Sequence, residues 1–447
     1  MDHSQSIAAN RLPPDVLARN FSDAHPPLTA AQAVIEADRC YFCYDAPCIE
    51  ACPTGINIPG FIKKISSGNV SGSARTILES NIFGGSCARV CPTEILCEDK
   101  CVRNTQEDRP LQIGALQRHA TDWQMQKMEQ PFVRAPLTGK HVAVVGAGPA
   151  GLSCAHRLAV HGYDVTVFDA RAKAGGLNEY GVAAYKLADE FAQKEVDFVM
   201  SIGGITIEAD MKLGRDMTLA SLNAEFDAVF LGIGHAGVRA LGITGEHLDG
   251  VRNAVDFIEE LRSSPTKSDV AVGRHVVVIG GGNTAIDAAV QAKRLGAEEV
   301  TLVYRRAAEN MSATTVEQEW AQTNNVTLRY WSAPVRIDGD GGKISSITFA
   351  RGLLKDGRPV YELGEYTLAA DMLLKAVGQL FLPDPLVDDE ILIEDGRIKV
   401  DAEGRTTMRG VYAGGDCTAG EDLTVAAVRD GRNAAEAINA DLMMVGN

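Results

Sequence analysis

Residues 141–152 read HVAVVGAGPAGL, and they contain the most informative motif of the chain. A largely apolar run leads into glycines at positions 146, 148 and 151, in the order predicted strand, turn, helix. This is the G-x-G-x-x-G pattern in the setting where it binds a dinucleotide. The glycines let backbone N–H groups approach a pyrophosphate, whose charge the positive end of the helix dipole favours.

A second strand, predicted at residues 164–168, completes this βαβ unit and leads to Asp169. The carboxylate lies about twenty residues beyond the glycines, where such folds place an acid that accepts hydrogen bonds from a ribose. The motif therefore predicts a nucleotide site formed by Gly146, Gly148, Gly151 and Asp169.

The pattern occurs again at residues 275–306, with Gly280, Gly281 and Gly282 after a strand and a helix from Asn283. Ala285 takes the place of the third glycine, which such motifs permit. After the second strand stand Arg305 and Arg306, which could bind a 2′-phosphate or could simply be solvated. A second dinucleotide fold follows.

Length and composition restrict the class of protein. At 447 residues the chain is too long for one hydrophobic core. Dividing this length by a typical domain size gives about three domains. The formal charge of −16 argues against nucleic-acid or membrane partners, because both require a basic face. The N-terminus lacks an apolar signal segment, and no run is long enough to span a membrane. We therefore expect a soluble cytoplasmic protein.

Eight of the ten cysteines lie between positions 40 and 101. They form two runs, Cys40, Cys43, Cys48, Cys52 and Cys87, Cys91, Cys97, Cys101, with a proline after Cys52 and after Cys91. Ferredoxin-type segments hold [4Fe-4S] clusters in this way, with the last cysteine of a run crossing to the other cluster. The alternative is a pair of structural zinc sites, but zinc favours paired C-x2-C knuckles and only one such pair occurs. The spacing favours two iron–sulfur clusters.

The remaining stretches suit helices and strands around these motifs. We predict helices at residues 29–38, capped by Thr29, at 112–127 and at 424–438, with helical structure within 58–80. Strands are predicted at residues 227–237, 344–349, 361–368, 371–377 and 410–416. A linker is expected at residues 131–140 and a ligand-binding loop at 173–187. The strand ending in Gly415 and Asp416 can bring an acid and a helix N-terminus to a ligand.

Together these elements predict a multidomain fold: an α-helical Fe–S domain followed by two Rossmann-like domains in a glutathione-reductase-like arrangement. The domains are expected at residues 1–135, at 136–240 with 376–447 for FAD, and at 241–375 for the nicotinamide nucleotide. A nicotinamide delivers hydride whereas a cluster accepts single electrons, so a flavin must lie between them. No cysteine lies between Cys154 and Cys417, so the electrons must leave through the clusters. We expect no catalytic residue beyond the cofactors.

The whole chain resembles the small, flavin-containing subunit of glutamate synthase and its relatives. Within that family it is most similar to the N-terminal half of dihydropyrimidine dehydrogenase and the equivalent separate bacterial subunit. The segment Cys43-Tyr-Asp-Ala-Pro-Cys48 and the motif GGGNTAID carry this closer similarity.

The resemblance implies a set of cofactor contacts. One cluster would be held by Cys40, Cys43, Cys48 and Cys101, and the other by Cys52, Cys91, Cys97 and Gln117. Cys87 would then not be a ligand, although eight thiolates would suffice for two all-cysteine clusters. FAD would be bound by Ala147 to Gly151, Asp169, Leu177, Lys186, Gly415, Asp416 and Thr424. The nicotinamide nucleotide would be bound by Gly280, Gly281, Gly282, Asn283, Thr284, Arg305, Arg306, Ala376, Val377 and Gly378.

The resemblance also bears on substrate and partner. The animal enzyme, which uses NADPH, has a further basic residue where Ser312 stands here, so we favour NAD(H). It also continues into an FMN barrel, whereas this sequence stops at Asn447. The expected partner is a PreA-like subunit carrying FMN, further clusters and the pyrimidine site, in a heterotetramer that reduces uracil or thymine with NADH. Two alternatives stay open: the small subunit of glutamate synthase, and a zinc-stabilised nucleotide-binding scaffold without turnover.

Overall fold

The computed structural model describes residues 6–107, 109–386 and 390–444. They divide into two compact units. Unit 1 comprises residues 6–24, Tyr180–Ala188 and Gly237–Leu380, and unit 2 comprises His25–Glu179, Asp189–Ala236 and the described residues from Phe381 onward. Among the described residues, each helix is too short or too polar to cross a membrane.

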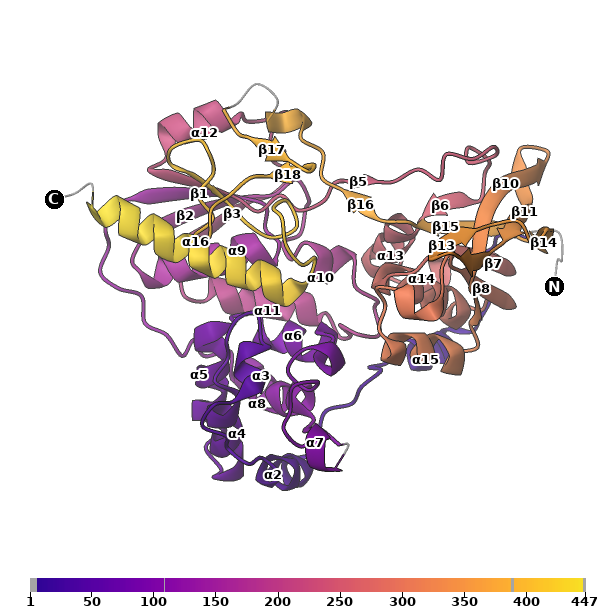
Figure 1. Ribbon diagram of the computed structural model, residues 1–447. Coiled ribbons are helices and arrows are strands. Elements are labelled where there is room, and N and C mark those ends of the chain that lie inside the picture. The colour runs from indigo at the N-terminus through magenta and orange to yellow at the C-terminus, as the bar shows by residue number, and fades with distance from the viewer. Residues whose placement is uncertain (1–5, 108, 387–389, 445–447) are drawn as a thin grey trace. The chain divides into compact units, whose positions relative to one another are not determined.

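The first part of unit 2 is a helical domain that carries the eight clustered cysteines (Figure 1). Its helices are α2 (Ala30–Asp38), α3 (Pro47–Glu50), α4 (Ile58–Ser66), α5 (Val70–Ser80), α6 (Gly84–Val90), α7 (Asn104–Glu107) and α8 (Ile113–Lys127), with the 3-10 turn η1 (Thr93–Ile95). Thr29 forms a capping box with Gln32 at the start of α2, which confirms the predicted cap. The predicted region 58–80 is two helices, because Gly68 adopts a positive φ of 78° between them.

The second part of unit 2 is a parallel sheet with the strand order β19-β4-β1-β2-β3. The strands are β1 (His141–Val145), β2 (Asp164–Phe168), β3 (Ile205–Glu208), β4 (Ala228–Leu231) and β19 (Val411–Ala413). Helix α9 (Pro149–Val160) packs on the sheet and α16 (Thr424–Met444) lies along α9, as both overview figures show. Further elements are α10 (Leu177–Tyr180), α11 (Phe191–Met200), α12 (Leu219–Glu225), η4 (Asp384–Leu386), β17 (Ile393–Glu394) and β18 (Arg397–Ile398).

Unit 1 is built on a second parallel sheet, in the order β6-β15-β7-β8-β9. These strands are β6 (Val251–Asn253), β15 (Met372–Ala376), β7 (His275–Gly280), β8 (Glu299–Val303) and β9 (Thr327–Arg329). The helices are α1 (Pro14–Asn20), α13 (Ala254–Ser263), α14 (Asn283–Arg294) and α15 (Thr315–Thr323), with 3-10 turns η2 (Lys267–Asp269) and η3 (Ala308–Asn310). Antiparallel strands complete the unit: β5 (Gly237–Val238), β10 (Ser332–Asp340), β11 (Lys343–Arg351), β12 (Leu353–Lys355), β13 (Arg358–Val360), β14 (Glu365–Ala369) and β16 (Gln379–Leu380).

The predicted fold class is confirmed, with some local differences. The strand predicted at residues 361–368 begins only at Glu365, because Gly364 turns the chain with a φ of 88°. The final helix continues to Met444, beyond the predicted end at residue 438. The first described residues, 6–24, pack with unit 1 through Leu17 and Phe21 rather than with the cysteine-bearing helices.

In both parallel sheets, the glycine-rich turn follows a strand next to the point where strand order reverses. In unit 2 the reversal lies between β1 and β4, and in unit 1 between β7 and β15. Open α/β sheets bind ligands at the carboxyl ends of the strands at such switch points. The topology therefore places both predicted nucleotide motifs where this class of fold binds nucleotides.

Candidate functional site

The first glycine turn is closely packed, so that only glycine fits at two of its positions. Gly146 has a φ of 102°, and a Cβ there would lie 2.3 Å from the carbonyl oxygen of Gly232, which follows β4. A Cβ on Gly151 would lie 1.8 Å from the oxygen of Gly146. Helix α9 starts after Gly148 without a side-chain cap. The N–H groups of its first turn therefore remain for a bound anion.

Asp169 lies directly beside this turn. Its carboxylate accepts hydrogen bonds from the backbone N–H groups of Ala147 (2.6 Å) and Arg171 (2.7 Å). Burial raises its pKa, and these two hydrogen bonds oppose that effect. Each carboxylate oxygen can still accept a further hydrogen bond, as a ribose requires.

The opposite wall of this site comes from residues 175–178 and from the region of β19. Gly176 has a φ of 54°, and a Cβ there would lie 2.7 Å from the Cα of Gly148. Asn178 accepts a hydrogen bond from Thr424 Oγ1 at 3.1 Å, while its buried Nδ2 has no partner among the described residues. Burial raises the pKa of Asp416 to about 6. The uncapped helix, the glycine cradle and the unpaired amide fit a flavin dinucleotide.

In unit 1 the second glycine turn has the same construction. Gly280 pairs with Ala376 across β7 and β15, and a Cβ on Gly280 would lie 2.3 Å from the oxygen of Ala376. Helix α14 begins after Gly282 without a side-chain cap. The buried Oδ1 of Asn283 has no partner among the described residues. Ala376, Val377 and Gly378 therefore lie with Gly280–Asn283 at one edge of the sheet, and they fit a nicotinamide dinucleotide.

Arg305 and Arg306 follow β8 at this same edge, and both are exposed. The carbonyl of Arg305 accepts a hydrogen bond from the Tyr361 hydroxyl at 2.6 Å, and Arg306 lies 5.8 Å from the centre of the Tyr304 ring. Ser312 donates to the carbonyl of Gly281 at 3.4 Å. Both guanidinium groups and the Ser312 hydroxyl therefore come from segments bordering the glycine turn.

Lys186 has partners that the sequence did not suggest. Its ammonium group is buried in unit 1 and pairs with Asp287 (2.9 Å) and Glu317 (2.6 Å). The structure thus groups Lys186 with the second nucleotide fold, whereas Leu177, Asp416 and Thr424 belong to unit 2 with the first.

The cysteines form two groups in the helical domain. Cys40, Cys43, Cys48 and Cys101 line one pocket together with Ile58, Ile62, Leu111 and Ile113. Burial, followed by the charges of Cys40 and Cys101, raises the pKa of Cys48 to about 12. Thiolates gathered in an apolar pocket repel one another unless a metal centre binds them, so the donor set fits an all-cysteine cluster.

The second group contains Cys52, Cys91, Cys97 and also Cys87. A hydrogen bond with Cys87 raises the pKa of Cys91, as do burial and the charges of Cys87, Cys97 and Cys52. Gln117 on α8 donates from Nε2 to the carbonyl of Gly84 at 2.7 Å, which leaves its amide oxygen as the atom able to bind iron. The donors fit a second cluster with either Cys87 or Gln117 as the fourth ligand. All ten cysteines are free in the structure.

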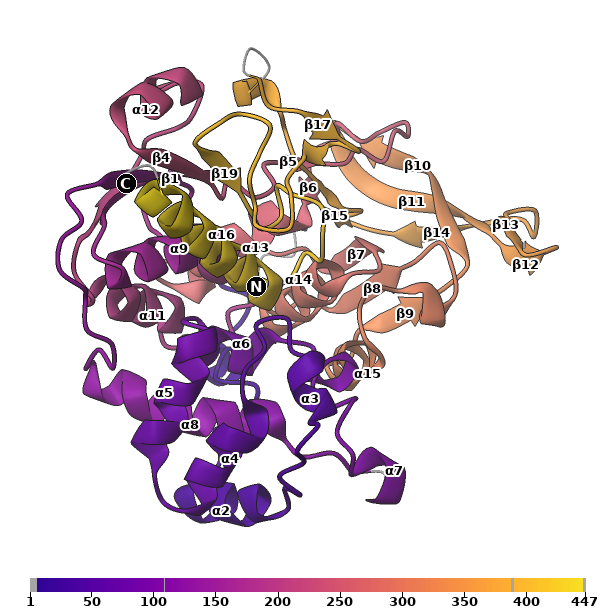
Figure 2. The same cartoon turned by 60° about the vertical axis from the view of Figure 1, so that its left-hand side comes forward.

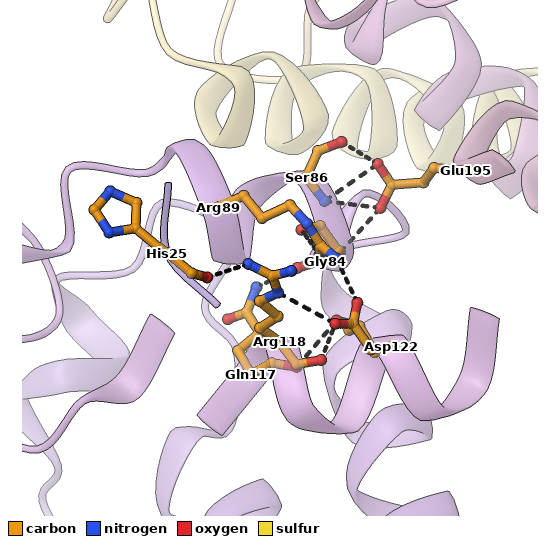
Figure 3. A network of polar contacts seen from close by, with 10 residues as sticks. His25, Gly84, Ser86, Arg89, Gln117, Arg118, Asp122 and Glu195 are labelled. Atoms are coloured by element: carbon orange, nitrogen blue, oxygen red, sulfur yellow. Dashed lines mark hydrogen bonds and ion pairs between the residues drawn. The ribbon is translucent and has the colours of Figure 1, made fainter. Parts of the chain in front are cut away.

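A polar network that the sequence analysis missed connects the helical domain to the flavin fold (Figure 3). Glu195 on α11 is fully buried and accepts hydrogen bonds from the N–H groups of Gly85 (2.9 Å) and Ser86 (3.0 Å) and from the Ser86 hydroxyl. Arg89 pairs with Asp122 at 2.6 Å. The sequence feature that could have predicted this network is an acidic residue, Glu195, among the inward-facing apolar positions of the helix at 191–200.

Comparison with known proteins identifies the class. Residues 17–129 match the family model described as dihydropyrimidine dehydrogenase domain II, 4Fe-4S cluster, and residues 140–431 match pyridine nucleotide-disulphide oxidoreductase. Among solved structures, FprA from Mycobacterium tuberculosis in complex with NADPH has a TM-score of 0.58 at 20% identity, covering 70% of this chain and 86% of that one. Thioredoxin reductase of T. acidophilum has a TM-score of 0.54 at 23% identity, covering 68% and 99%. These likenesses show the two-nucleotide fold.

Curated relatives narrow the class. The NAD-dependent dihydropyrimidine dehydrogenase subunit PreT of Escherichia coli O157:H7 is 35% identical over 93% of this chain and 95% of its own length. The glutamate synthase [NADPH] small chain of Escherichia coli K12 is 32% identical over 97% and 96%. The chain therefore belongs to the glutamate synthase small-subunit-like flavoprotein family, and to the PreT type within it. It is an NAD(P)H-dependent flavin and iron–sulfur oxidoreductase.

Proposed function

We propose that this chain is the electron-input subunit of a dihydropyrimidine dehydrogenase. The observation that carries the proposal is that both cysteine groups and the flavin-type fingerprint lie in one compact unit. A flavin bound there would accept hydride from a nicotinamide and release single electrons. The route outward leads to the clustered cysteines, because no cysteine lies between Cys154 and Cys417 in the sequence that could supply a redox-active pair.

The residues of the chain then have definite tasks. In unit 2, the first turn of α9 binds the FAD pyrophosphate, Asp169 the ribose, and Leu177, Gly415, Asp416 and Thr424 the opposite wall. In unit 1, Gly280–Thr284 bind the pyrophosphate of the nicotinamide nucleotide, with Ala376–Gly378 at the same sheet edge. Lys186 remains a proposed flavin contact that would first have to leave Asp287 and Glu317. Two [4Fe-4S] clusters occupy the two cysteine groups.

We further propose NAD(H) as the preferred nucleotide. The arginines after β8 are exposed, and Ser312 offers a hydroxyl rather than a charge near the glycine turn. A 2′-phosphate of NADP(H) would therefore meet fewer fixed cationic side chains here than it would if a basic residue stood in place of Ser312. Four PreT relatives, from Escherichia coli and Salmonella, are named NAD-dependent.

The partner is proposed to be a PreA-like subunit with FMN, further clusters and the pyrimidine site, assembled with this chain into a heterotetramer. The test is an anaerobic purification of the chain with its genomic neighbour, followed by an NADH oxidation assay. We expect NADH oxidation that depends on uracil. Oxidation that instead requires 2-oxoglutarate with glutamine would assign the chain to the glutamate synthase branch. A colourless protein that contains zinc would contradict both.

A further inference from the structure

Arg432 on α16 occupies a position between the flavin fold and the cysteine-bearing domain. The preceding residue, Gly431, allows α16 to press against the fingerprint helix, since a Cβ there would lie 1.9 Å from the carbonyl oxygen of Ala150. Helix α16 also contacts α6 of the cysteine-bearing domain, which lies below α16 in Figure 2. Arg432 is therefore fixed in place by a close helix contact at the proposed flavin site.

The guanidinium of Arg432 extends from α16 to two backbone carbonyl groups of the cysteine-bearing domain. Its Nη1 donates to the carbonyl oxygens of Thr54 (2.9 Å) and Ser80 (2.7 Å). Thr54 lies two residues after Cys52, and Ser80 is the last residue of α5. One side chain of the flavin fold therefore holds the turn that begins at Cys52.

Thr54 extends this contact to the sulfur atom. The residue is buried, and its Oγ1 lies 3.3 Å from Cys52 Sγ. Once the sulfur is a thiolate bound to iron, only the hydroxyl can donate in this contact. A continuous chain of contacts thus runs from Arg432 through the backbone and hydroxyl of Thr54 to the Cys52 sulfur.

Arg432 also brings a positive charge to the turn that contains this sulfur, at the carbonyl oxygen of Thr54. Burial and the neighbouring Arg157 lower its pKa, while Glu436 and Cys52 oppose the shift. A guanidinium nevertheless stays protonated in proteins at neutral pH. Nearby charge and hydrogen bonds to sulfur are two of the features through which a protein adjusts the reduction potential of an iron–sulfur cluster.

We propose that Arg432 is a positioning residue that raises the reduction potential of the cluster held by Cys52. It does so by orienting the Thr54 hydroxyl toward the Cys52 sulfur and by placing its own charge at the turn that contains this sulfur. The inference rests on the proposed function, in which that cluster receives electrons from the flavin. A higher potential makes the cluster a better acceptor for those electrons.

The test is a redox titration of the full chain, purified without oxygen and followed by EPR. We expect R432Q to lower the reduction potential of one cluster signal. At the midpoint potential of the wild type, the oxidised-to-reduced ratio of that cluster should rise about tenfold, which corresponds to a shift of about 59 mV for one electron. T54V, which removes only the hydroxyl, should shift the same signal in the same direction by less. R432K keeps the charge and should fall between R432Q and the wild type.

Arg157 provides a matched control. It crosses from α9 to the carbonyl oxygen of Glu79 at 2.6 Å and pairs with Glu436 at 3.6 Å, so R157Q removes a charge and a docking contact from the same interface. We expect its cluster potentials to equal those of the wild type.

The outcomes separate this inference from the proposed function. Full iron content in R432Q with unshifted potentials would overturn the inference alone, as would equal shifts in R432Q and R157Q. If R432Q loses its iron, an unshifted signal in T54V would overturn it. A wild-type chain without iron would overturn the proposed function and the inference together.

Discussion

At the residue scale, Cys87 and Gln117 are the two candidates for the fourth donor of the second cysteine group. The structure brings Cys87 into hydrogen-bond contact with Cys91, whereas the nitrogen of Gln117 is bound to the carbonyl of Gly84. Thiolates are the usual ligands of such clusters, so proximity favours Cys87. The family resemblance instead implies Gln117, and this stays the prediction.

We expect C87A to keep both clusters and Q117A to lose the second one, with about half of the iron. The reason is that removing a ligand leaves an open iron position, whereas removing a buried non-ligand leaves only a small cavity. Iron analysis and EPR of the two variants would show this, with C91A as the positive control for ligand loss. Iron loss in C87A but not in Q117A would make Cys87 the ligand.

Glu195 allows a second prediction at this scale. Burial raises its pKa to about 7, above the ordinary 4.5, so the folded chain binds this proton more tightly than the unfolded chain. Its contribution to stability is therefore full below about pH 4.5 and is lost as the pH rises through about 7. The shift corresponds to about 3 kcal/mol.

E195Q keeps an oxygen acceptor for Gly85 and Ser86 but does not titrate. We expect the Tm of the wild type, measured relative to that of E195Q, to fall by several degrees between pH 5 and pH 8. Thermal unfolding of both proteins across this range would measure it. A Tm difference that is independent of pH would contradict the assigned pKa. E195A, which leaves two buried N–H donors without an acceptor, should be destabilised at every pH.

At the scale of elements, the two βαβ units share one construction and differ after the second strand. β2 leads to Asp169, which binds the glycine turn through Ala147. β8 leads to Arg305 and Arg306, which are exposed, and Ser312 reaches the carbonyl of Gly281. An acid suits an unmodified ribose, and cations suit a 2′-phosphate. The choice between NADH and NADPH therefore depends on a few side chains at one strand end.

S312R should raise the ratio of kcat/KM for NADPH to that for NADH by about tenfold. The added guanidinium would supply one charge-assisted hydrogen bond to a 2′-phosphate, worth about 1.4 kcal/mol or more. Steady-state kinetics with an artificial electron acceptor would measure both nucleotides. S312A adds no charge and should leave the ratio as it is. A parallel decline for both nucleotides in S312R would show that Ser312 does not face the 2′ position.

At the scale of the whole molecule, the chain is an NAD(P)H-dependent flavin and iron–sulfur oxidoreductase, and the proposed function assigns the pyrimidine site to a partner subunit. We therefore expect the isolated chain to transfer two electrons per NADH to a one-electron acceptor such as ferricyanide, with uracil unchanged. Anaerobic stoichiometry and product analysis would test this. Dihydrouracil formed by the isolated chain would contradict the division of tasks between two subunits.

The sequence by itself determined the motif-bearing elements. Both strand–glycine–helix units were predicted because close packing at Gly146, Gly151 and Gly280 excludes any side chain, and such local constraints are visible in the residue pattern. The cap at Thr29 is equally local. Cysteine spacing likewise indicated two cluster-binding groups. The family comparisons agree with this class.

Only the tertiary structure decided which distant residues meet. Lys186 pairs with Asp287 and Glu317, Glu195 binds the start of α6, and Arg432 reaches the Cys52 turn, although these partners lie about one hundred residues or more apart in the chain. Such contacts have no periodic or spacing signal. They arise because buried charges must find partners, and packing alone determines which partners are within reach.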